Sequence, residues 1–305
     1  DLVVVNDAAT LPASLRGRTA AGEPFELRLS GPIEGRRLAG VLFGRGDWRT
    51  RTEDRPAPPP VRAGEVVRVG PLTARVLAAD GRRVVLDVGA DSTGTGTGTG
   101  EDEADARAAL WHAIYASGVP VQYAHRRDPL ALWSVQTAYA TRPWAVEMPS
   151  AGRPLTWEVL LALRRRGIGV AALTHAAGLG STGDAALDAA LPWPEPYEVP
   201  EATAGAVART RAAGGRVIAV GTTVVRALEA SGGRAGTGVA TLRLDAGTAR
   251  HVVDGLVSGL HVPGESHHEL LRAFASRALL DRGLDVARAH RLSAHELGDA
   301  LLIVP

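Results

Sequence analysis

The chain has 305 residues, of which 45% are hydrophobic, and this length is enough for two globular domains. It contains no cysteine and its 34 basic residues are all arginine, so disulfides, thiolate nucleophiles, Schiff-base lysines and P-loop lysines are excluded. A net charge of +1 gives no global argument for nucleic acid. Since no apolar run approaches about 18 residues, we expect a cytoplasmic protein with no membrane partner.

The first residues have the pattern of a buried strand, because Asp1 is followed at once by four apolar residues, 2–5. We therefore expect the natural protein to carry a further segment ahead of Asp1. A turn at Asn6-Asp7 and an extended piece after Pro12 complete the region up to residue 20.

Residues 21–91 predict a small antiparallel β-barrel, because short apolar runs recur between turn signals. The runs are 25–29, 38–43, 66–69, 74–77 and 84–88. Residues 92–100 are a low-complexity Ser/Thr/Gly stretch and predict a linker.

From residue 101 onward, helical and strand patterns alternate. Helices are expected over 102–117, 156–166, 202–213, 222–230 and 266–280, and strands over 168–173, 216–220, 240–244 and 256–261. Thr156 is the expected cap of its helix, and Ser266 with Glu269 has the spacing of a capping box. We predict an α/β domain, residues 1–20 plus 101–305, into which the barrel of residues 21–91 is inserted.

The stretch 216–229 reads as a buried strand that enters a helix through Gly221-Thr222-Thr223. The first N–H groups of a helix have no intrahelical acceptor, so this turn suits the carboxylate or hydroxyls of a small ligand. Arg226, one turn later, adds a fixed charge. The alternative is an ordinary crossover in which a threonine only caps the helix.

Several further segments resemble, in order, the motifs of one protein family. They are Val4-Val5-Asn6-Asp7, residues 134–140, Pro149-Ser150-Ala151-Gly152, Glu195 with 197–200, Gly221-Thr222-Thr223 with 226–229, Leu260-His261-Val262-Pro263 and 298–303. With these matches the chain resembles the S-adenosylmethionine:tRNA ribosyltransferase-isomerase family of queuosine biosynthesis.

The resemblance implies an enzyme that uses S-adenosylmethionine as co-substrate. The family transfers and isomerises its ribosyl part onto a 7-deazaguanine base of tRNA and releases adenine and methionine. Such chemistry needs a base for a proton beside the sulfonium, groups that hold the methionine carboxylate, and acid assistance for adenine.

The chain departs from the family pattern at several polar positions. Ala8-Ala9 replaces Thr-Arg, Arg153-Pro154 replaces a Leu-His pair, His175 is displaced by about one position, Trp193 replaces a histidine, and Gly264 replaces a lysine. The alternative is therefore a divergent relative that cleaves S-adenosylmethionine with another, small-molecule acceptor or none. A non-catalytic binding protein is a third reading, and the oligomeric state is open.

The resemblance and the strand pattern together select the candidate site residues. As catalytic groups we select His261, His175, Glu195 and Tyr197; as S-adenosylmethionine contacts, Gly221, Thr222, Thr223, Arg226, Gln136, Tyr139 and Arg142. Both histidines follow strands, where sites of α/β proteins usually lie. The competing readings are core histidines, a loop tethered by Glu195 and Tyr197, strand packing of Gln136 and Tyr139, and a solvated Arg142. His267 and His268 lack carboxylates at ligand spacing, so no metal is expected.

Overall fold

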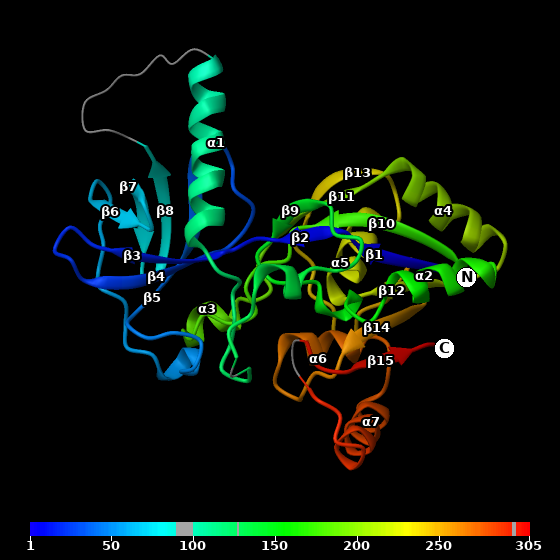
Figure 1. Ribbon diagram of the computed structural model, residues 1–305. Helices are drawn as coiled ribbons and strands as arrows, with labels where there is room; N and C mark the ends of the chain where they lie inside the picture. The colour runs from blue at the N-terminus through cyan, green and yellow to red at the C-terminus, as the bar shows by residue number, and fades with distance from the viewer. Residues whose placement is uncertain (90–99, 127, 295–296) are drawn as a thin grey trace. The chain divides into compact units, whose positions relative to one another are not determined.

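The computed structural model describes residues 1–89, 100–126, 128–294 and 297–305, which fall into two compact units (Figure 1). The α/β unit comprises Asp1–Ala9, Gln136–Ala177 and Pro192–Pro305, and the barrel unit comprises Thr10–Val135 and Gly178–Leu191. An α/β fold interrupted by a β-barrel was predicted from the sequence, and this fold class is confirmed. The expected linker, 92–100, lies outside the described residues except for Gly100, where α1 begins.

The barrel is a closed antiparallel sheet in the order β3-β4-β5-β8-β7-β6. Its strands are β3 (Ser14–Arg18), β4 (Pro24–Leu29), β5 (Arg37–Phe43), β6 (Val66–Val69), β7 (Leu72–Asp80) and β8 (Arg83–Val88). The first barrel strand precedes the expected boundary at residue 21, because Gly17 and Arg18 pair with β6 and close the barrel. The unit also contains η1 (Thr52–Asp54), α1 (Gly100–Ser117), η2 (Leu132–Val135) and α3 (Ala185–Ala189).

Three charged residues lie inside the barrel unit. Glu26 accepts hydrogen bonds from Ser14 Oγ at 2.7 Å, Arg28 Nε at 2.7 Å and Arg55 Nη1 at 2.6 Å. Burial raises the pKa of Glu26, but the charges of Arg28 and Arg55 outweigh burial and bring the pKa to about 2. Glu26 is therefore an ionised buried carboxylate held by two arginines.

The α/β unit is built on a seven-stranded sheet in the order β13-β11-β10-β1-β12-β14-β15. The strands are β1 (Leu2–Asn6), β10 (Gly169–His175), β11 (Glu195–Val199), β12 (Val217–Val220), β13 (Gly236–Ala240), β14 (Gly255–Gly259) and β15 (Ala300–Ile303). β1 is parallel to β10 and β12, and β12 is parallel to β14, whereas β11 and β15 run antiparallel to their inner neighbours. A separate two-stranded sheet joins β2 (Ala8–Thr10) to β9 (Arg142–Ala145).

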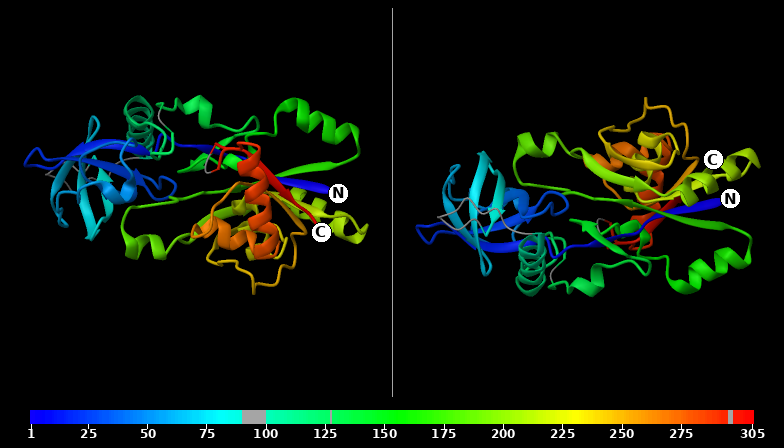
Figure 2. Two further views of the ribbon diagram at one scale, coloured as in Figure 1. Left: turned by 90° about the horizontal axis from the view of Figure 1, so that it is seen from below. Right: turned by 90° about the horizontal axis from the view of Figure 1, so that it is seen from above.

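Both faces of the central strands are covered, which explains their nearly continuous apolar sequences. Leu2 and Val4 belong to a core that includes side chains of α4 (Glu201–Ala212), α5 (Thr222–Ser231), α6 (Ser266–Leu271) and α7 (Arg277–Ala289). Val3 and Val5 pack on the other face with side chains of α2 (Trp157–Arg165) and η3 (Ser150–Gly152). Figure 2 shows α2 and α4 on opposite sides of β1. The side chain of Thr156 accepts from Val159 N, so the predicted cap of α2 is confirmed.

Two elements near the C-terminus differ from the sequence expectation. The helix expected over 266–280 is divided into α6 and α7, because Arg250 Nε binds the carbonyl of Ala273 at 2.9 Å and Ser276 caps a new helix at Leu279 N. The predicted capping box is wrong, since Glu265 is the N-cap of α6 and makes no side-chain cap bond. The strand expected over 240–244 lies earlier, as β13, because β11 pairs with Gly236–Ala240.

Among the described residues, no helix has the length and apolar character that crossing a bilayer would require.

Candidate active site

The sheet topology brings the ends of several strands to one edge. β1, β10, β12 and β14 are parallel, so their last residues lie at a common carboxyl edge. β11 is antiparallel to β10 and pairs Tyr197 with His175, so Glu195, the first residue of β11, lies at the same edge. Ligands of open α/β sheets bind at this edge. Residues as far apart in the chain as Asn6 and Gly259 are thereby collected at one edge.

Asn6, the last residue of β1, links three elements at the carboxyl edge. Its Oδ1 accepts from His175 N at 2.9 Å, and its Nδ2 donates to the carbonyl of His175 at 2.9 Å. The same Nδ2 donates to Thr223 Oγ1 at 3.3 Å. Asn6 is 1% exposed, so its amide fixes β10 and the start of α5 relative to β1.

Arg226 of α5 ties together the segments around the carboxyl edge. Its Nη1 donates to Glu195 Oε2, its Nε to the carbonyl of Leu242 at 3.2 Å, and its Nη2 to the carbonyls of Trp193 at 3.0 Å and Ala240 at 2.8 Å. Each guanidinium nitrogen thus already has a protein acceptor. The expected contact of Arg226 with a ligand stays a prediction, and the structure gives this residue a clear bracing role.

His175 lies beside the Arg226–Glu195 pair and is fully buried. Its Nε2 is 3.6 Å from Glu195 Oε2, beyond hydrogen-bond distance, and neither ring nitrogen has a hydrogen-bond partner among the described residues. Burial, followed by the charge of Arg226, lowers the pKa of His175 to about 3. His175 is therefore a neutral imidazole with two unsatisfied nitrogens, both ring nitrogens of His268 likewise lack a partner among the described residues, and each such buried group calls for an explanation such as a catalytic role.

α5 begins at the edge without a side-chain cap. Gly221 is the N-cap, in a backbone conformation of φ 92° that favours glycine, and it has no side chain to accept from the first turn. The alternative in which a threonine caps this helix is wrong, because Thr222 and Thr223 are both already helical. The uncapped N–H groups and the half-buried Thr223 leave this turn suited to an anionic or hydroxyl group of a ligand.

His261 follows β14 by two residues and forms a second polar group at the edge. Its Nδ1 is 3.3 Å from Glu265 Oε2, and its ring stacks on His267 with centroids 4.8 Å apart and planes inclined by 17°. Glu265 Oε2 also accepts from Val262 N at 3.2 Å, which fixes the carboxylate. Contact of Nδ1 with the carboxylate orients the ring and leaves Nε2 as its other proton-transfer atom.

The positive charge of Arg226 lowers the pKa values of two histidines near the carboxyl edge, His175 and His267. Burial lowers the pKa of His267 to about 4, and the neighbouring His261 and the more distant Arg226 contribute in the same direction, against Glu265. Arg226 also lowers the pKa of His175. The charge of Arg226 therefore acts on both His175 and His267 and favours their neutral imidazoles near neutral pH.

Two further candidates, Tyr139 and Tyr197, pack tightly against glycines. The Tyr139 hydroxyl lies so close to Gly152 that no Cβ fits there, and burial followed by the charge of Asp7 raises the pKa of Tyr139. Tyr197 is 8% exposed and belongs to the core, where it similarly excludes a Cβ at Gly238. Their roles at the site stay predictions.

Arg142 and Gln136 are less constrained by the core. Arg142 Nη1 donates to Glu198 Oε2 at 2.6 Å, and the guanidinium lies 3.8 Å from the centroid of the Trp144 ring. Gln136 directly follows η2 and is half-buried. Both stay predicted substrate contacts.

Residues 1–303 match the protein family described as Queuosine biosynthesis protein. The chain is 35% identical over its full length to the S-adenosylmethionine:tRNA ribosyltransferase-isomerase of Anaeromyxobacter sp. (strain K), of which it covers 84%. It is also 35% identical to the enzyme of that name from Sorangium cellulosum (strain So ce56), over 99% of this chain and 83% of the relative. This chain belongs to the queuosine biosynthesis protein family.

A solved structure of an S-adenosylmethionine tRNA ribosyltransferase from Thermotoga maritima matches 100% of this chain and 82% of its own, with 22% identity and a TM-score of 0.46. The family resemblance drawn from the sequence motifs is confirmed by the full-length match.

Three residues at the carboxyl edge of the sheet were not selected as site residues from the sequence. Asn6 appeared only as part of a strand motif, although a polar residue at the end of an apolar strand is itself a signal. Glu265 stands four residues after His261, a spacing that can pair the two side chains around a turn. His267 gave no such signal, because its stacking on His261 depends on the loop conformation. Within the described residues, no group of three His, Asp or Glu side chains is placed to hold a metal ion.

Proposed function

We propose that this protein is a cytoplasmic enzyme that transfers and isomerises the ribosyl part of S-adenosylmethionine onto a 7-deazaguanine base of tRNA, releasing adenine and methionine. Full-length identity of 35% to relatives named for this activity carries the proposal. The same similarity weighs against the alternative of a different acceptor, because it spans both the polar edge and the barrel.

The turn at the start of α5 fits a carboxylate or hydroxyls of S-adenosylmethionine. Gly221 has no side chain to cap the helix, no recorded side-chain bond of the described residues satisfies the first-turn N–H groups, and the half-buried Thr223 carries a hydroxyl beside them. A helix N-terminus also carries a partial positive charge, which favours the methionine carboxylate. Arg226 would support this turn indirectly, through Glu195 and the carbonyls that it holds.

His261 is the best-placed group for proton transfer. Its side chain is 13% exposed and Glu265 orients its ring through Nδ1, so Nε2 can meet a substrate proton. His175 is 0% exposed and would act as a positioning residue, since a substrate atom cannot reach its ring without a rearrangement. Because the pKa values of His175 and His267 are lowered to about 3 and about 4, neither ring would add positive charge near the cationic sulfonium.

The reaction is tested by measuring release of adenine and methionine from S-adenosylmethionine. We expect release with tRNA that carries 7-aminomethyl-7-deazaguanine, and none with the same tRNA carrying guanine. Equal release with both RNAs, or release without RNA, would contradict the proposed acceptor.

The α5 turn is tested by Thr223→Ala, with Thr241→Ala as control because Thr241 is exposed. Loss of one hydrogen bond corresponds to about 1 kcal/mol, so we expect the dissociation constant for S-adenosylmethionine to rise roughly fivefold in the first variant only. Isothermal titration calorimetry measures it. Unchanged affinity of Thr223→Ala would remove this turn from the site.

Proton transfer is tested by His261→Ala, with His290→Ala as an exposed control in the same unit. We expect turnover to fall by about 100-fold or more for His261→Ala, with a much smaller change in substrate affinity. Glu265→Gln should give an intermediate loss, because the ring remains but loses its orienting carboxylate. Wild-type turnover in His261→Ala would make the residue a packing group.

A further inference from the structure

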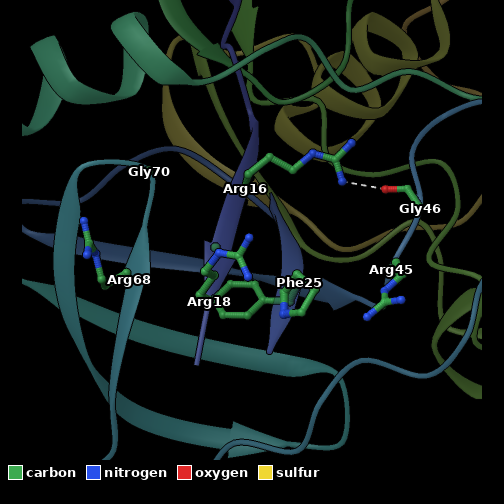
Figure 3. Close-up of a pocket in the computed structure, with 10 residues that line it drawn as sticks. Arg16, Arg18, Phe25, Arg45, Gly46, Arg68 and Gly70 are labelled. Atoms are coloured by element: carbon green, nitrogen blue, oxygen red, sulfur yellow. Dashed lines mark hydrogen bonds between the residues drawn. The ribbon is translucent and has the colours of Figure 1, made fainter. Parts of the chain in front are cut away.

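The barrel carries an open groove of about 510 Å³ on its outer surface. Four arginines line it, Arg16, Arg18, Arg45 and Arg68, and Phe25 forms part of its wall (Figure 3). None of the lining residues, all of which belong to the described part of the chain, is acidic. We call this feature the arginine groove.

Strand alternation explains why the side chains of Arg16, Arg18 and Arg68 face outward. In β3 the exposed Arg16 and Arg18 flank the buried Gly17, and in β6 Arg68 is exposed between buried Val67 and Val69. A Cβ at residue 17 would collide with the ring of Phe25, so glycine allows this aromatic ring to lie directly beneath the strand. The groove is therefore built into the barrel closure between β3 and β6.

Like charges meet across that closure. Arg18 and Arg68 are direct partners in the antiparallel pairing of β3 with β6. Like charges at directly opposite positions destabilise a sheet, because their Cβ atoms are only about 5 Å apart. A barrel selected for stability alone would place an acidic residue at one of these two positions.

Acidic neighbours compensate little of this charge. Arg16 Nη1 lies 3.9 Å from Glu26 Oε2, but Glu26 already binds Arg28 and Arg55. Arg16 and Arg18 otherwise donate to the carbonyls of Gly46 at 2.5 Å and Gly22 at 2.8 Å, which carry no net charge.

Of the four arginines, Arg45 and Arg68 have the side chains that are least engaged by protein groups. Across the described residues, neither side chain has a recorded hydrogen bond or ion pair, and both are exposed. The whole chain has a net charge of +1, so the groove is a local concentration of positive charge on a nearly neutral protein. Such a local field attracts polyanions even where the net charge does not.

We propose that the arginine groove binds consecutive phosphates of the RNA backbone, as a contact region separate from the residues of the carboxyl edge. This inference rests on the proposed function, which supplies RNA as substrate. Guanidinium groups bind phosphate oxygens in a bidentate manner, and their planar faces stack on bases. Four such groups along one groove match a chain of phosphates better than a single small anion.

The test compares Arg18→Gln/Arg68→Gln with Arg37→Gln/Arg62→Gln. Both double variants remove two exposed barrel-unit charges, but Arg37 and Arg62 do not line the groove. Affinity for tRNA is measured by fluorescence anisotropy over a range of salt concentrations. Each lost phosphate contact reduces the slope of log K against log salt by about 0.7 to 0.9.

We expect the groove variant to bind tRNA at least tenfold more weakly and with a slope reduced by about 1.5, while the control variant stays close to wild type. The affinity of the groove variant for S-adenosylmethionine should not change. Arg68→Gln alone should raise the melting temperature, because it removes the repulsion with Arg18. If the double variant does not fold, Arg45→Gln, a change in a connecting segment, replaces it.

Identical tRNA affinities and salt slopes for the groove and control variants would overturn the inference, as would saturation of the groove by inorganic phosphate without preference for RNA. Failure of the proposed function gives a different result. If wild-type protein binds tRNA through the groove but releases no adenine, the reaction assignment falls and the groove stands.

Discussion

A buried carboxylate binds arginine in each of the two units, and the two carboxylates differ in the other groups beside them. In the barrel unit, Glu26 accepts from Ser14, Arg28 and Arg55, and its pKa falls to about 2. In the α/β unit, Glu195 binds Arg226 and lies beside His175, a neutral ring whose two nitrogens have no hydrogen-bond partner among the described residues.

This difference separates a structural cluster from a candidate functional one. Removing one partner of a buried ion pair is strongly destabilising, so a carboxylate between two arginines holds its surroundings firmly. An unsatisfied buried imidazole contributes little stability and is expected to persist where it serves a reaction. Measuring how much Glu26 and His175 each contribute to the free energy of unfolding tests whether the two clusters differ in this way.

The largest effect is expected for Glu26→Gln. Two buried guanidinium groups would lose their counter-charge, so the free energy of unfolding should fall by about 3 to 5 kcal/mol. Guanidinium chloride denaturation at pH 7 measures the change, with the exposed Glu23→Gln as control. A loss as small as that of the control would show that Arg28 and Arg55 find other partners.

Acid should weaken the wild-type barrel by a comparable, slightly smaller amount. The folded pKa of Glu26 is about 2, below its ordinary value of 4.5, so its ionisation stabilises the fold above pH 4.5 and this contribution is lost as the pH falls toward 2. The difference corresponds to about 3 kcal/mol. Denaturation curves between pH 6 and pH 2 should show the loss in wild type and not in Glu26→Gln.

The smallest effect is expected for His175→Leu. No hydrogen bond of the ring is lost and the volumes are similar, so the free energy of unfolding should fall by only about 1 kcal/mol. Turnover should fall much more, since the ring lies against Glu195. If His175→Leu lost as much stability as Glu26→Gln in the same denaturation experiment, both clusters would serve mainly to stabilise the fold.

The fold class could be predicted because it depends on local patterns. Short apolar runs between turns are typical of a barrel, and alternating periods of two and 3.6 residues are typical of an α/β domain. The Thr156 cap was predictable for the same reason, since it needs only the helix that follows. The break between α6 and α7 was not, because it depends on Arg250, which comes from another segment and binds Ala273.

The site was predictable only in part. Strand ends pointed to His175 and to the Gly221 turn, but the register of β11 decides that Glu195 reaches His175 and Arg226. That register is a long-range property with no local signal. The burial of Arg226 likewise depends on carbonyls of residues 193, 240 and 242, which the sequence does not bring together.

The central position of β1 has a consequence for the order of events during synthesis. β1 precedes every other strand of its sheet in the chain, yet Leu2 pairs with Gly169 and Val217, so the strand has no sheet partner until much of the chain has left the ribosome. The six barrel strands are complete by Val88 and pair among themselves. Nascent domains fold as their residues become available, and distant pairings form late. The barrel strands should therefore assemble first, while β1 remains an unpaired apolar segment that is exposed to aggregation until its partner strands are made.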